Sequence, residues 1–480
     1  MNLSLFRALR TGTLPRIAFV GAGGKTTTMF QLARGLIGKE AKSVIVTATS
    51  HLGSWQISLA DVHLVAESHA ALEENKHQFN GVILITGELD GDRTRPLRDH
   101  TLQWLHQYCE DHSLPLLIEA DGSRQKPLKA WKENEPSIPS FVNQVVQVVG
   151  LSGVGKSLDD DHVHRPEIFS KLSGLNLGEP VTTDALINVL VHPEGGMKRI
   201  PAHARRTILL NQADNAERQA IAYGLVQSLL SAYDSVVISS LEQEVILAVH
   251  EPVAGIILAA GESSRFGETK QLLDWKGKPF VRAVAMTAIE SGLSPVVVVT
   301  GANAEKVEFV VKDLDIILIR NQDWKSGQGS SIKAGIKTLT SPPSTLPHIQ
   351  RQIHSIENED LHVGFGRGAS PERWSEGVGG AIFLLTDQPQ ITPSILRALV
   401  QRHAEGLFPI VAPIVMDRRA NPVLFDREAF ADLMTLEGDV GGRGIFHKHR
   451  VEYLPWHDDR LLLDVDTPEM YQRLISDETL

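Results

Sequence analysis

Residues 258–270 read LAAGESSRFGETK and directly follow the apolar run 253–257. Because glycine and small residues let backbone N–H groups approach an anion closely, this stretch predicts a phosphate-binding loop after a buried strand. The expected backbone contacts come from Leu258, Ala259, Ala260, Gly261 and Ser263. Arg265 and Lys270 supply the positive charge that a triphosphate needs as it becomes pyrophosphate. The competing interpretation is a glycine turn with two solvated cations, since short motifs also match by chance.

A second glycine loop lies near the N-terminus, where residues 21–28 read GAGGKTTT. It follows the apolar run 17–20 and precedes the helix-length stretch 29–37. A strand, a glycine loop and a helix in this order predict nucleotide binding, with Lys25 reaching the β- and γ-phosphates and Thr26 binding Mg²⁺. The expected contacts are Gly21, Gly23, Gly24, Lys25 and Thr26. The strict P-loop motif would need a glycine at Phe19, so an ordinary glycine turn stays open as the alternative.

Short β-branched runs alternate with helix-length amphipathic stretches through both halves of the chain. This alternation predicts an α/β fold with parallel sheets. The expected strands are 17–20, 44–47, 82–85, 116–119, 145–149, 208–210, 236–238, 245–249, 255–258, 296–299, 316–319, 382–385 and 410–412. The expected boundary near Glu251-Pro252 gives domains 1–250 and 251–480, the second with a loop insertion at about 341–379.

Two carboxylates of the second half follow apolar runs, at positions where open α/β sheets place their ligands. Asp387 follows the run 382–385, and Asp466 follows the run 461–463, which we expect to be a strand. Mg²⁺ prefers few carboxylates together with phosphate oxygens, so Asp387 and Asp466 predict a metal site. Alternatively, Asp466 caps the helix expected from Pro468.

The first half has a similar pair of carboxylates after the run 116–118, namely Glu119 and Asp121. A nucleotide-binding domain holds its metal or orients a nucleophile at such a position. We expect Asp121 to bind Mg²⁺ together with Thr26.

The composition is that of an ordinary globular protein and disfavours several classes of function. Lys and Arg number 47 against 58 Asp and Glu, and the resulting net charge of −11 disfavours sequence-independent nucleic-acid binding. The single cysteine, Cys109, excludes an intramolecular disulfide and a cysteine-rich metal cluster. The apolar runs fall short of the roughly 18 residues that cross a membrane. We therefore expect a cytoplasmic protein with neither a nucleic-acid nor a membrane partner.

The second half resembles the molybdenum cofactor guanylyl- and cytidylyltransferase family over about residues 253–475. Six motifs occur in the same order: the loop 258–270, GQGSSIKAG at 327–335, TDQP at 386–389, NPV at 421–423, GDVGGR at 438–443 and DVDTP at 464–468. The resemblance implies a Rossmann-like nucleotidyltransferase of the nucleotide-diphospho-sugar transferase type. Such an enzyme transfers a nucleotide to molybdopterin cofactor and releases pyrophosphate.

The same resemblance implies roles for the residues at matching positions. These are Arg265, Lys270 and Asp387 for catalysis, Asp387 and Asp466 for Mg²⁺, and Asn421, Asp439 and Arg443 for the cofactor substrate. The Ala-Ala-Gly form of residues 259–261 resembles the cytidylyl branch. CTP is therefore the expected nucleotide and CMP the group transferred.

The first half is similar to the YqeC-like accessory proteins of selenium-dependent hydroxylases over about residues 5–240. The matching stretches are the loop 21–27, TATSH at 47–51, EADGSR at 119–124, KPLK at 126–129, EPSIP at 135–139 and HRPE at 164–167. The resemblance implies an accessory role, and the glycine loop predicts a P-loop-like domain with ATP or GTP as its nucleotide.

Together the two resemblances predict a maturation protein for molybdenum hydroxylases, with the hydroxylase apoenzymes or their maturation chaperones as partners. Its C-terminal half would transfer CMP from CTP to molybdenum cofactor, and its N-terminal half would use a nucleotide to modify, activate or hand over that cofactor. Two alternatives stay open. One is a nucleotidyltransferase with another phosphate acceptor, and the other is a cofactor-binding chaperone without catalysis.

Overall fold

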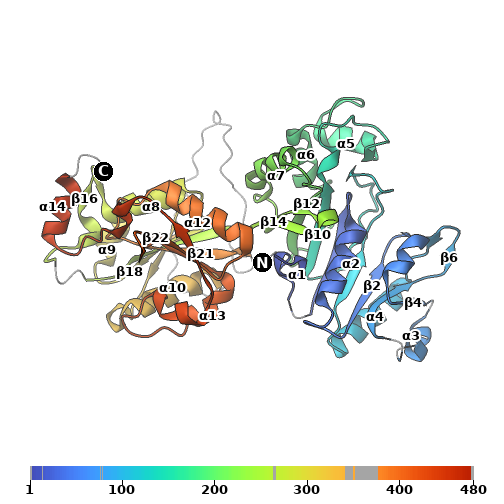
Figure 1. The fold of residues 1–480 in the computed structure, drawn as a ribbon, viewed down its shortest axis with the longest axis horizontal. Helices are drawn as coiled ribbons and strands as arrows, with labels where there is room; N and C mark the ends of the chain where they lie inside the picture. The colour runs from blue at the N-terminus through green and yellow to red at the C-terminus, as the bar shows by residue number, and fades with distance from the viewer. Residues whose placement is uncertain are drawn as a thin grey trace. The chain divides into compact units, whose positions relative to one another are not determined.

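The computed structural model describes residues 3–12, 14–66, 68–75, 77, 79–262, 266–340, 350–351 and 377–476. Two compact units divide the chain, the first ending at His250 and the second beginning at Glu251 (Figure 1). Each unit has its own mostly parallel sheet with helices packed against it. Within the described ranges, no helix combines the length and the apolar character needed to cross a membrane.

The N-terminal unit is built on a nine-stranded sheet in the order β14-β13-β12-β10-β1-β8-β2-β5-β4. All neighbouring strands are parallel except β13 and β14. The strands are β1 (Arg16–Gly21), β2 (Ser43–Ala48), β4 (Val62–Val65), β5 (Gly81–Thr86), β8 (Leu116–Glu119), β10 (Gln144–Gly150), β12 (Arg205–Asn211), β13 (Ser235–Ser240) and β14 (Val245–His250). Buried central strands such as β1 and β10 appear in the sequence as nearly continuous apolar runs because helices cover both of their faces.

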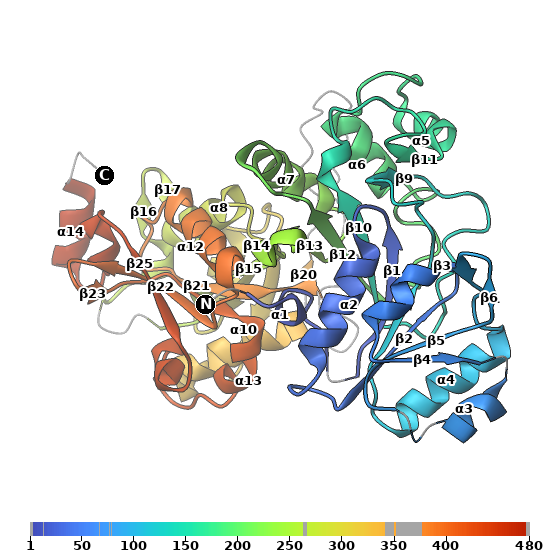
Figure 2. The ribbon, with the colours of Figure 1, turned by 45° about the vertical axis from the view of Figure 1, so that its right-hand side comes forward.

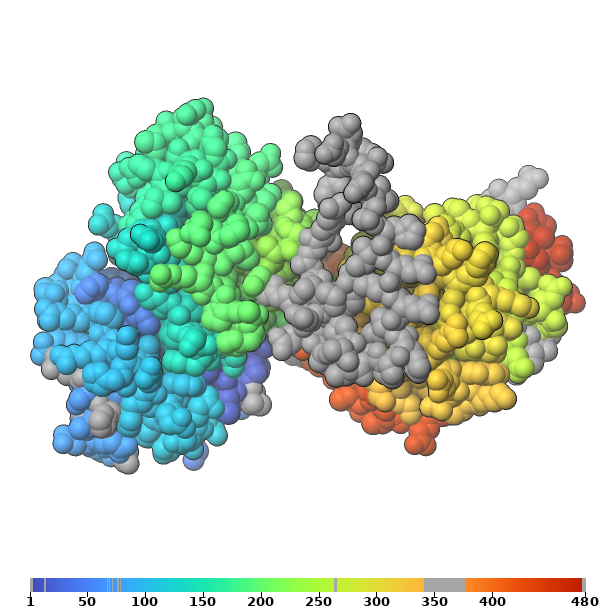
Figure 3. Space-filling view, turned by 180° about the vertical axis from the view of Figure 1, so that it is seen from behind, coloured from blue at the N-terminus to red at the C-terminus, as the bar shows by residue number. Residues whose placement is uncertain are grey.

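The helices of this unit are α1 (Leu5–Ala8), α2 (Lys25–Leu36), α3 (His69–Asn75), α4 (Asp99–Asp111), α5 (Pro166–Ser173), α6 (Thr183–Val191) and α7 (Ala216–Leu229). Helix α2 begins at Lys25, earlier than the predicted start at Met29. In Figure 2, α3 and α4 lie side by side near β4. Helices α5 and α6 form one end of the unit, seen from opposite sides in Figures 1 and 3. There β9 (Leu128–Lys129) pairs in parallel with β11 (Val163–His164).

The C-terminal unit has a second sheet in the order β20-β19-β18-β15-β21-β24-β22-β23, with β25 also paired to β22. Its strands are β15 (Val253–Ala259), β18 (Val296–Thr300), β19 (Ile317–Arg320), β20 (Gln350–Arg351), β21 (Gly380–Leu385), β22 (Ile410–Val415), β23 (Arg418–Arg419), β24 (Val423–Asp426) and β25 (Val451–Pro455). Strands β15, β18, β19 and β21 run parallel, and β24 is antiparallel to β21.

Helices cover both faces of this sheet because its central strands are apolar on both sides. Ile257 packs in one core with α8 (Phe280–Glu290) and α12 (Pro393–Gly406). The next residue along the strand, Ile256, faces the other core, with α10 (Gln328–Thr340) and α13 (Phe430–Leu433). The result is the three-layer α/β arrangement that the alternating pattern predicts.

One expected strand is absent from this unit. The run 461–463 falls largely within a 3-10 helix, η11 (Asp459–Leu462), so Asp466 follows a turn of helix and not a strand. Helix α14 (Pro468–Ser476) then begins at the expected proline. The predicted insertion at 341–379 lies outside the described residues except for 350–351 and 377–379.

Candidate functional site

The C-terminal unit has a topological switch point at β15. The chain proceeds from β15 to β18 and β19 on one side, whereas β21 pairs with the other side of β15. Open α/β sheets bind ligands at such a point, beyond the carboxyl ends of the strands. The glycine loop follows β15 at this edge, and Asp387 follows β21. The hydroxyl of Thr386 donates to the carbonyl of Leu258 at 3.3 Å, which joins the two strand ends.

Lys270 connects the two predicted metal-binding carboxylates. Its Nζ donates to Asp466 Oδ1 at 2.8 Å and to Asp387 Oδ2 at 3.4 Å. Lys270 begins the 3-10 helix η5 (Lys270–Leu272), which immediately follows the glycine loop. Segments that are far apart in the sequence therefore place one cation and two anions at the edge of the sheet where a triphosphate is expected.

The electrostatics of this cluster suit a phosphate and a divalent cation. Burial raises the pKa of Asp387, and the charge of Asp466 adds to the rise against the opposing charge of Lys270. Burial alone would lower the pKa of Lys270, but its hydrogen bond to Asp466 and the charge of Asp387 raise it overall. Asp387 Oδ1 is buried and has no hydrogen-bond partner among the described residues. This carboxylate oxygen is therefore available as a ligand of the kind that Mg²⁺ prefers.

Two glutamines that the sequence analysis missed fix the position of the second carboxylate. Gln388 Nε2 donates to Asp464 Oδ1 at 2.7 Å, and Gln390 Nε2 donates to the carbonyl of Leu463 at 2.7 Å. The backbone N–H of Val465 also donates to the carbonyl of Asp387 at 3.0 Å. Both glutamines are at most 8% exposed. The segment that carries Asp466 is thus tied to the turn that carries Asp387.

Part of the predicted glycine loop lies outside the described residues. Leu258 and Ala259 end β15, and Ala260 and Gly261 follow it. Ser263 and the predicted catalytic Arg265 belong to the undescribed stretch 263–265. A third glutamine that the sequence analysis missed, Gln271, donates from Nε2 to the carbonyl of Gly261 at 2.8 Å and so connects the loop to η5.

The motifs expected to contact the cofactor substrate are also brought together. The backbone N–H of Gly329 donates to the carbonyl of Gly438 at 3.0 Å. Gly327 has a φ of 105°, and a Cβ there would lie 2.2 Å from the carbonyl carbon of Gly438. Only glycine tolerates this approach. The loop 438–443 therefore packs on the start of α10.

Of the predicted substrate-binding residues, Asp439 and Arg443 are exposed on this loop. The charge of Arg443 reaches Asp464, where it opposes the rise in the carboxyl pKa that burial causes. Asn421 lies two residues before β24, whose antiparallel pairing with β21 places it at the same edge of the sheet as Asp387. All three residues therefore lie toward the site rather than at the opposite edge.

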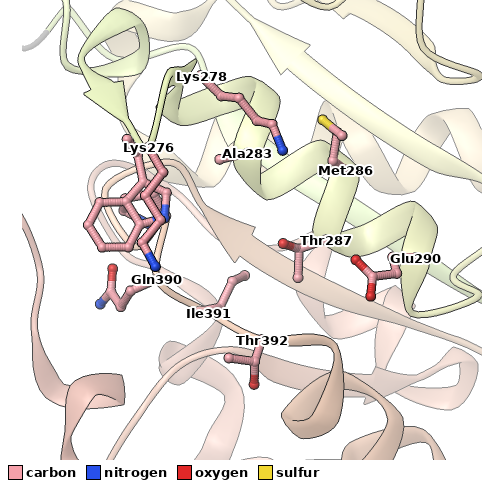
Figure 4. Close-up of a pocket in the computed structure, with 11 residues that line it drawn as sticks. Lys276, Lys278, Ala283, Met286, Thr287, Glu290, Gln390, Ile391 and Thr392 are labelled. Carbon is pink, nitrogen blue, oxygen red and sulfur yellow. The ribbon is translucent and has the colours of Figure 1, made fainter. Parts of the chain in front are cut away.

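A separate pocket of about 250 Å³ lies between α8, the hairpin before it and the segment 389–392 (Figure 4). Lys276 and Lys278 border it from the hairpin before α8, and Thr287 and Glu290 come from α8 itself. The segment 389–392 forms the remaining wall. None of the predicted site residues is among the described residues that line it. The pocket is therefore separate from the residues predicted to bind phosphate and metal.

The glycine loop of the N-terminal unit also follows a strand at a switch point. Strand β1 lies between β8 and β10, and β2 and β5 lie beyond β8. Gly21, Gly23 and Gly24 have φ values of 97°, 80° and 131°. A Cβ at Gly23 would lie 2.3 Å from the Cα of Gly150, so the loop packs directly on the end of β10. Asn211, which the sequence analysis did not place here, donates to the carbonyl of Gly23 at 2.9 Å.

Asp121 is the common partner of two lysines. Lys25 Nζ lies 3.2 Å from Asp121 Oδ1 and donates to the carbonyl of Gly21 at 2.7 Å. Lys129 Nζ donates to Asp121 Oδ2 at 2.9 Å. The backbone N–H of Gly21 and the indole N–H of Trp131 donate to the same oxygen at 3.0 and 2.6 Å. Asp121 and both lysines are at most 4% exposed, so Asp121 is a buried counter-ion.

Glu119, and not Asp121, is the carboxylate beside Thr26. Thr26 Oγ1 donates to Glu119 Oε2 at 3.1 Å, and Gln56 Nε2 donates to Thr26 Oγ1 at 3.1 Å. Burial raises the pKa of Glu119, against the opposing charge of Lys25. The three donors around Asp121 share its Oδ2, and Lys25 Nζ lies 3.2 Å from its Oδ1. A hydroxyl and a carboxylate oxygen of the kind that suits Mg²⁺ meet at Thr26 and Glu119. Thr26 thus contacts Glu119, and joint binding of Mg²⁺ by Asp121 and Thr26 stays a prediction.

Comparison with known proteins matches the two units to two different family models. Residues 17–167 match the family model of the YqeC protein, and residues 255–453 match that of the MobA-like NTP transferase domain. The chain is 29% identical over 217 residues to the uncharacterized protein YqeC of Escherichia coli (strain K12), covering 44% of this chain and 82% of that protein. It is 28% identical over 235 residues to the nicotine blue oxidoreductase of Paenarthrobacter nicotinovorans, covering 46% of this chain and 96% of that protein.

A third relative matches a shorter part of the chain. It is the probable molybdenum cofactor guanylyltransferase of Bacillus cereus (strain AH187), 43% identical over 110 residues, covering 22% of this chain and 54% of that protein. The C-terminal unit is thus a nucleotidyltransferase domain, which agrees with its switch-point site and its three-layer fold. The chain is a fusion of a YqeC-type domain with a MobA-like nucleotidyltransferase domain.

Proposed function

We propose that the C-terminal unit transfers CMP from CTP to molybdenum cofactor and releases pyrophosphate. The observation that carries the proposal is the joining of Lys270, Asp387 and Asp466 at the switch point of the sheet. The similarity to a probable molybdenum cofactor guanylyltransferase supports the choice of acceptor. The Ala-Ala-Gly form of residues 259–261 supports CTP.

The chemistry needs positioning and charge more than a protein nucleophile. Asp387 and Asp466 would hold Mg²⁺, which, when bound, stabilises negative charge on phosphate oxygens. Lys270 is kept protonated by its two carboxylates, so it can neutralise charge that moves onto the leaving pyrophosphate. The terminal phosphate of the acceptor is already ionised at neutral pH, so the attack on the α-phosphorus of CTP requires no general base. Arg265 is proposed as the second cation of the loop.

The first prediction concerns nucleotide choice. With purified protein, Mg²⁺ and molybdopterin-type cofactor, we expect pyrophosphate release from CTP to exceed that from GTP, ATP and UTP by at least about tenfold, the discrimination that a shaped pocket can supply. An assay coupled to inorganic pyrophosphatase measures the released pyrophosphate, and mass spectrometry identifies the product. CTP turnover with another phosphate acceptor but not with the cofactor would favour the alternative transferase. No turnover of any nucleotide by folded protein would favour the chaperone.

The N-terminal unit is proposed to bind ATP or GTP and to act on the same cofactor before or after the transfer. The support is its glycine loop at the switch point, followed directly by α2 and flanked by Lys25. Thr26 and Glu119 would hold Mg²⁺ there. We propose hydroxylase apoenzymes or their maturation chaperones as the partners that receive the product, and the cytoplasm as the compartment.

The second prediction tests this nucleotide site. Replacing Lys25 with alanine should weaken ATP or GTP binding by about tenfold to a hundredfold, because a charge-assisted hydrogen bond to phosphate is lost. Calorimetric titration in saturating CTP, which occupies the C-terminal unit, isolates the N-terminal event. Lys39→Ala, an exposed lysine just after α2, is the control. Unchanged affinity in Lys25→Ala would contradict the assignment.

A further inference from the structure

Lys129 is a buried cation, and the nucleotide-binding proposal gives it no role. Its side chain is only about 1% exposed, and its Nζ donates to Asp121 Oδ2 at 2.9 Å and to the carbonyl of Gly122 at 2.7 Å. Glu135 Oε2 lies 3.5 Å away. Burying an ammonium group is costly unless it is paired. Each of these two carboxylates also serves another cation, and a third carboxylate, Glu119, lies 3.9 Å from Lys25.

Asp121 is shared between Lys129 and Lys25, and Glu135 is shared between Lys129 and Arg165. Arg165 Nη2 donates to Glu135 Oε1 at 2.7 Å, and its Nη1 donates to the other carboxylate oxygen. Burial lowers the pKa of Lys129, and the charge of Lys25 lowers it further, against the raising effect of Asp121. The two ammonium groups are therefore close enough to repel each other across one carboxylate. An added anion would relieve that repulsion.

His164, on the strand beside Lys129, lies among several cations. His164 pairs across β11 with Lys129 on β9. Burial and the nearby charges of Arg165, Lys129 and Arg124 lower the pKa of His164 to about 4. The imidazole is therefore neutral at physiological pH, and the cations beside it outnumber the single nearby carboxylate, Glu135.

The backbone brings Lys129 to the flank of the glycine loop. The N–H of Gly23 donates to the carbonyl of Lys126 at 3.1 Å, and the N–H of Gly150 donates to the carbonyl of Pro127 at 3.0 Å. The segment that leads to Lys129 therefore runs along the loop that is proposed to hold phosphates. Lys25 stands at the start of α2 on the same loop, so the two lysines approach Asp121 from the two segments that border the phosphate site.

We propose that Lys129 is a second phosphate-binding lysine of the N-terminal unit, which acts with Lys25 on the terminal phosphates of a nucleoside triphosphate while Asp121 serves as the counter-ion of both. This inference rests on the proposed nucleotide binding by that unit. In the absence of nucleotide, Asp121 holds the two cations together. When nucleotide is bound, its phosphates neutralise part of the positive charge of Lys25 and Lys129.

The test replaces Lys129 with glutamine, which removes the charge and keeps an amide donor for Asp121 and Gly122. We expect ATP or GTP affinity, measured by titration in saturating CTP, to fall by about tenfold to a hundredfold. The dependence of affinity on salt should also become shallower, because one fewer cation meets the phosphates. Lys129→Arg should recover most of both effects. Lys132→Gln is the matched control, since Lys132 has a 59% exposed side chain near Glu135.

A purely structural role for Lys129 predicts a different pattern. Trp131 also donates to Asp121 Oδ2, so Trp131→Phe would then weaken binding as much as Lys129→Gln and leave the salt dependence unchanged. That result would overturn the inference, as would Lys129→Gln binding nucleotide as tightly as the parent. If the parent itself binds neither ATP nor GTP, the nucleotide-binding proposal fails, and the inference fails with it.

Should Lys129→Gln not fold, the parent protein still provides a test. The Lys129 ammonium lies 5.5 Å from the centre of the Trp131 ring. Binding of a triphosphate should draw it toward the phosphates and change the emission of Trp131, measured as the difference between the parent and Trp131→Phe. An unchanged difference spectrum, with nucleotide bound, would overturn the inference.

Discussion

Replacing Asp387 with asparagine is expected to lower the rate of nucleotidyl transfer by about 10²–10³-fold, the effect typical of removing one preorganised electrostatic group. The carboxylate contacts Lys270, and its second oxygen has no hydrogen-bond partner among the described residues. Asparagine has nearly the same shape as aspartate but no charge. Among the described residues, Lys270 then keeps Asp466 as its one close carboxylate. A metal ion would meet a neutral amide oxygen in place of a carboxylate. Pyrophosphate release with CTP and cofactor, measured over a range of Mg²⁺ concentrations, tests the prediction.

The fold itself should tolerate this change. Burial raises the pKa of Asp387, so its ionisation in the folded state costs stability, and that cost is present at neutral pH. Without metal, the unfolding midpoint of Asp387→Asn should therefore equal or exceed that of the parent. Asp432→Asn is the control, since Asp432 pairs with Lys448 and His449 away from the predicted site. A folded Asp387→Asn protein with full activity would remove Asp387 from the mechanism.

Replacing Asp121 with asparagine should destabilise the N-terminal unit by about 3–5 kcal/mol, because it leaves buried cations without their shared counter-ion. Lys25 and Lys129 both depend on this carboxylate. Denaturant unfolding followed by tryptophan fluorescence measures the loss. Pyrophosphate release by the C-terminal unit should continue, because each unit has its own hydrophobic cores. The exposed Asp160→Asn should stay within about 0.5 kcal/mol of the parent.

The stability lost on replacing Asp121 with asparagine depends on pH, and the direction of that dependence follows from the pKa of Asp121. Burial would raise the pKa of Asp121, but Lys129 and Lys25 lower it overall from its ordinary value of 3.8. Its stabilising contribution is therefore complete above 3.8 and is lost as the pH falls through the lower folded pKa. The difference between the parent and Asp121→Asn should be full at pH 7 and shrink in that acidic range. A difference that stays constant down to that range would show that Asp121 acts by shape rather than by charge.

Strands β1, β10 and β15 were predictable because they are buried on both faces and carry mostly apolar residues. Strand β4 was missed for the opposite reason, since only Leu64 of its four residues is buried. The run 461–463 was wrongly expected to be a strand. There the amides of Gln388 and Gln390 bind the carbonyls of Leu461, Leu463 and Arg460, so the backbone is satisfied by side chains rather than by a neighbouring strand. A local apolar pattern carries no information about such partners.

The candidate site, like the fold, was predictable only in part. Lys270, Asp387 and Asp466 were identified one by one because each belongs to a recognisable motif, but their ion pairs depend on the sheet order. The role of Asp121 depends on Lys129, whose neighbourhood the sequence does not reveal. Gln388 lies within the TDQP motif and Gln271 and Gln390 directly follow motifs, but their roles were missed because a glutamine has no chemical signature of its own. Their proximity to the glycine loop and to Asp387 is the one signal that the sequence contains.

The bonds that join the turn of Asp387 to the segment of Asp466 also set an order of events during protein synthesis. The two carboxylates are 79 residues apart, and ribosomes add about 5–20 residues each second, so roughly 4–16 s separate their synthesis. During that interval Gln388, Gln390 and Lys270 have emerged without the segment to which they bind. The nascent domain can therefore acquire its sheet before it can hold a complete set of charges. Translation in this way delays transferase competence until the strands that support it are already in place.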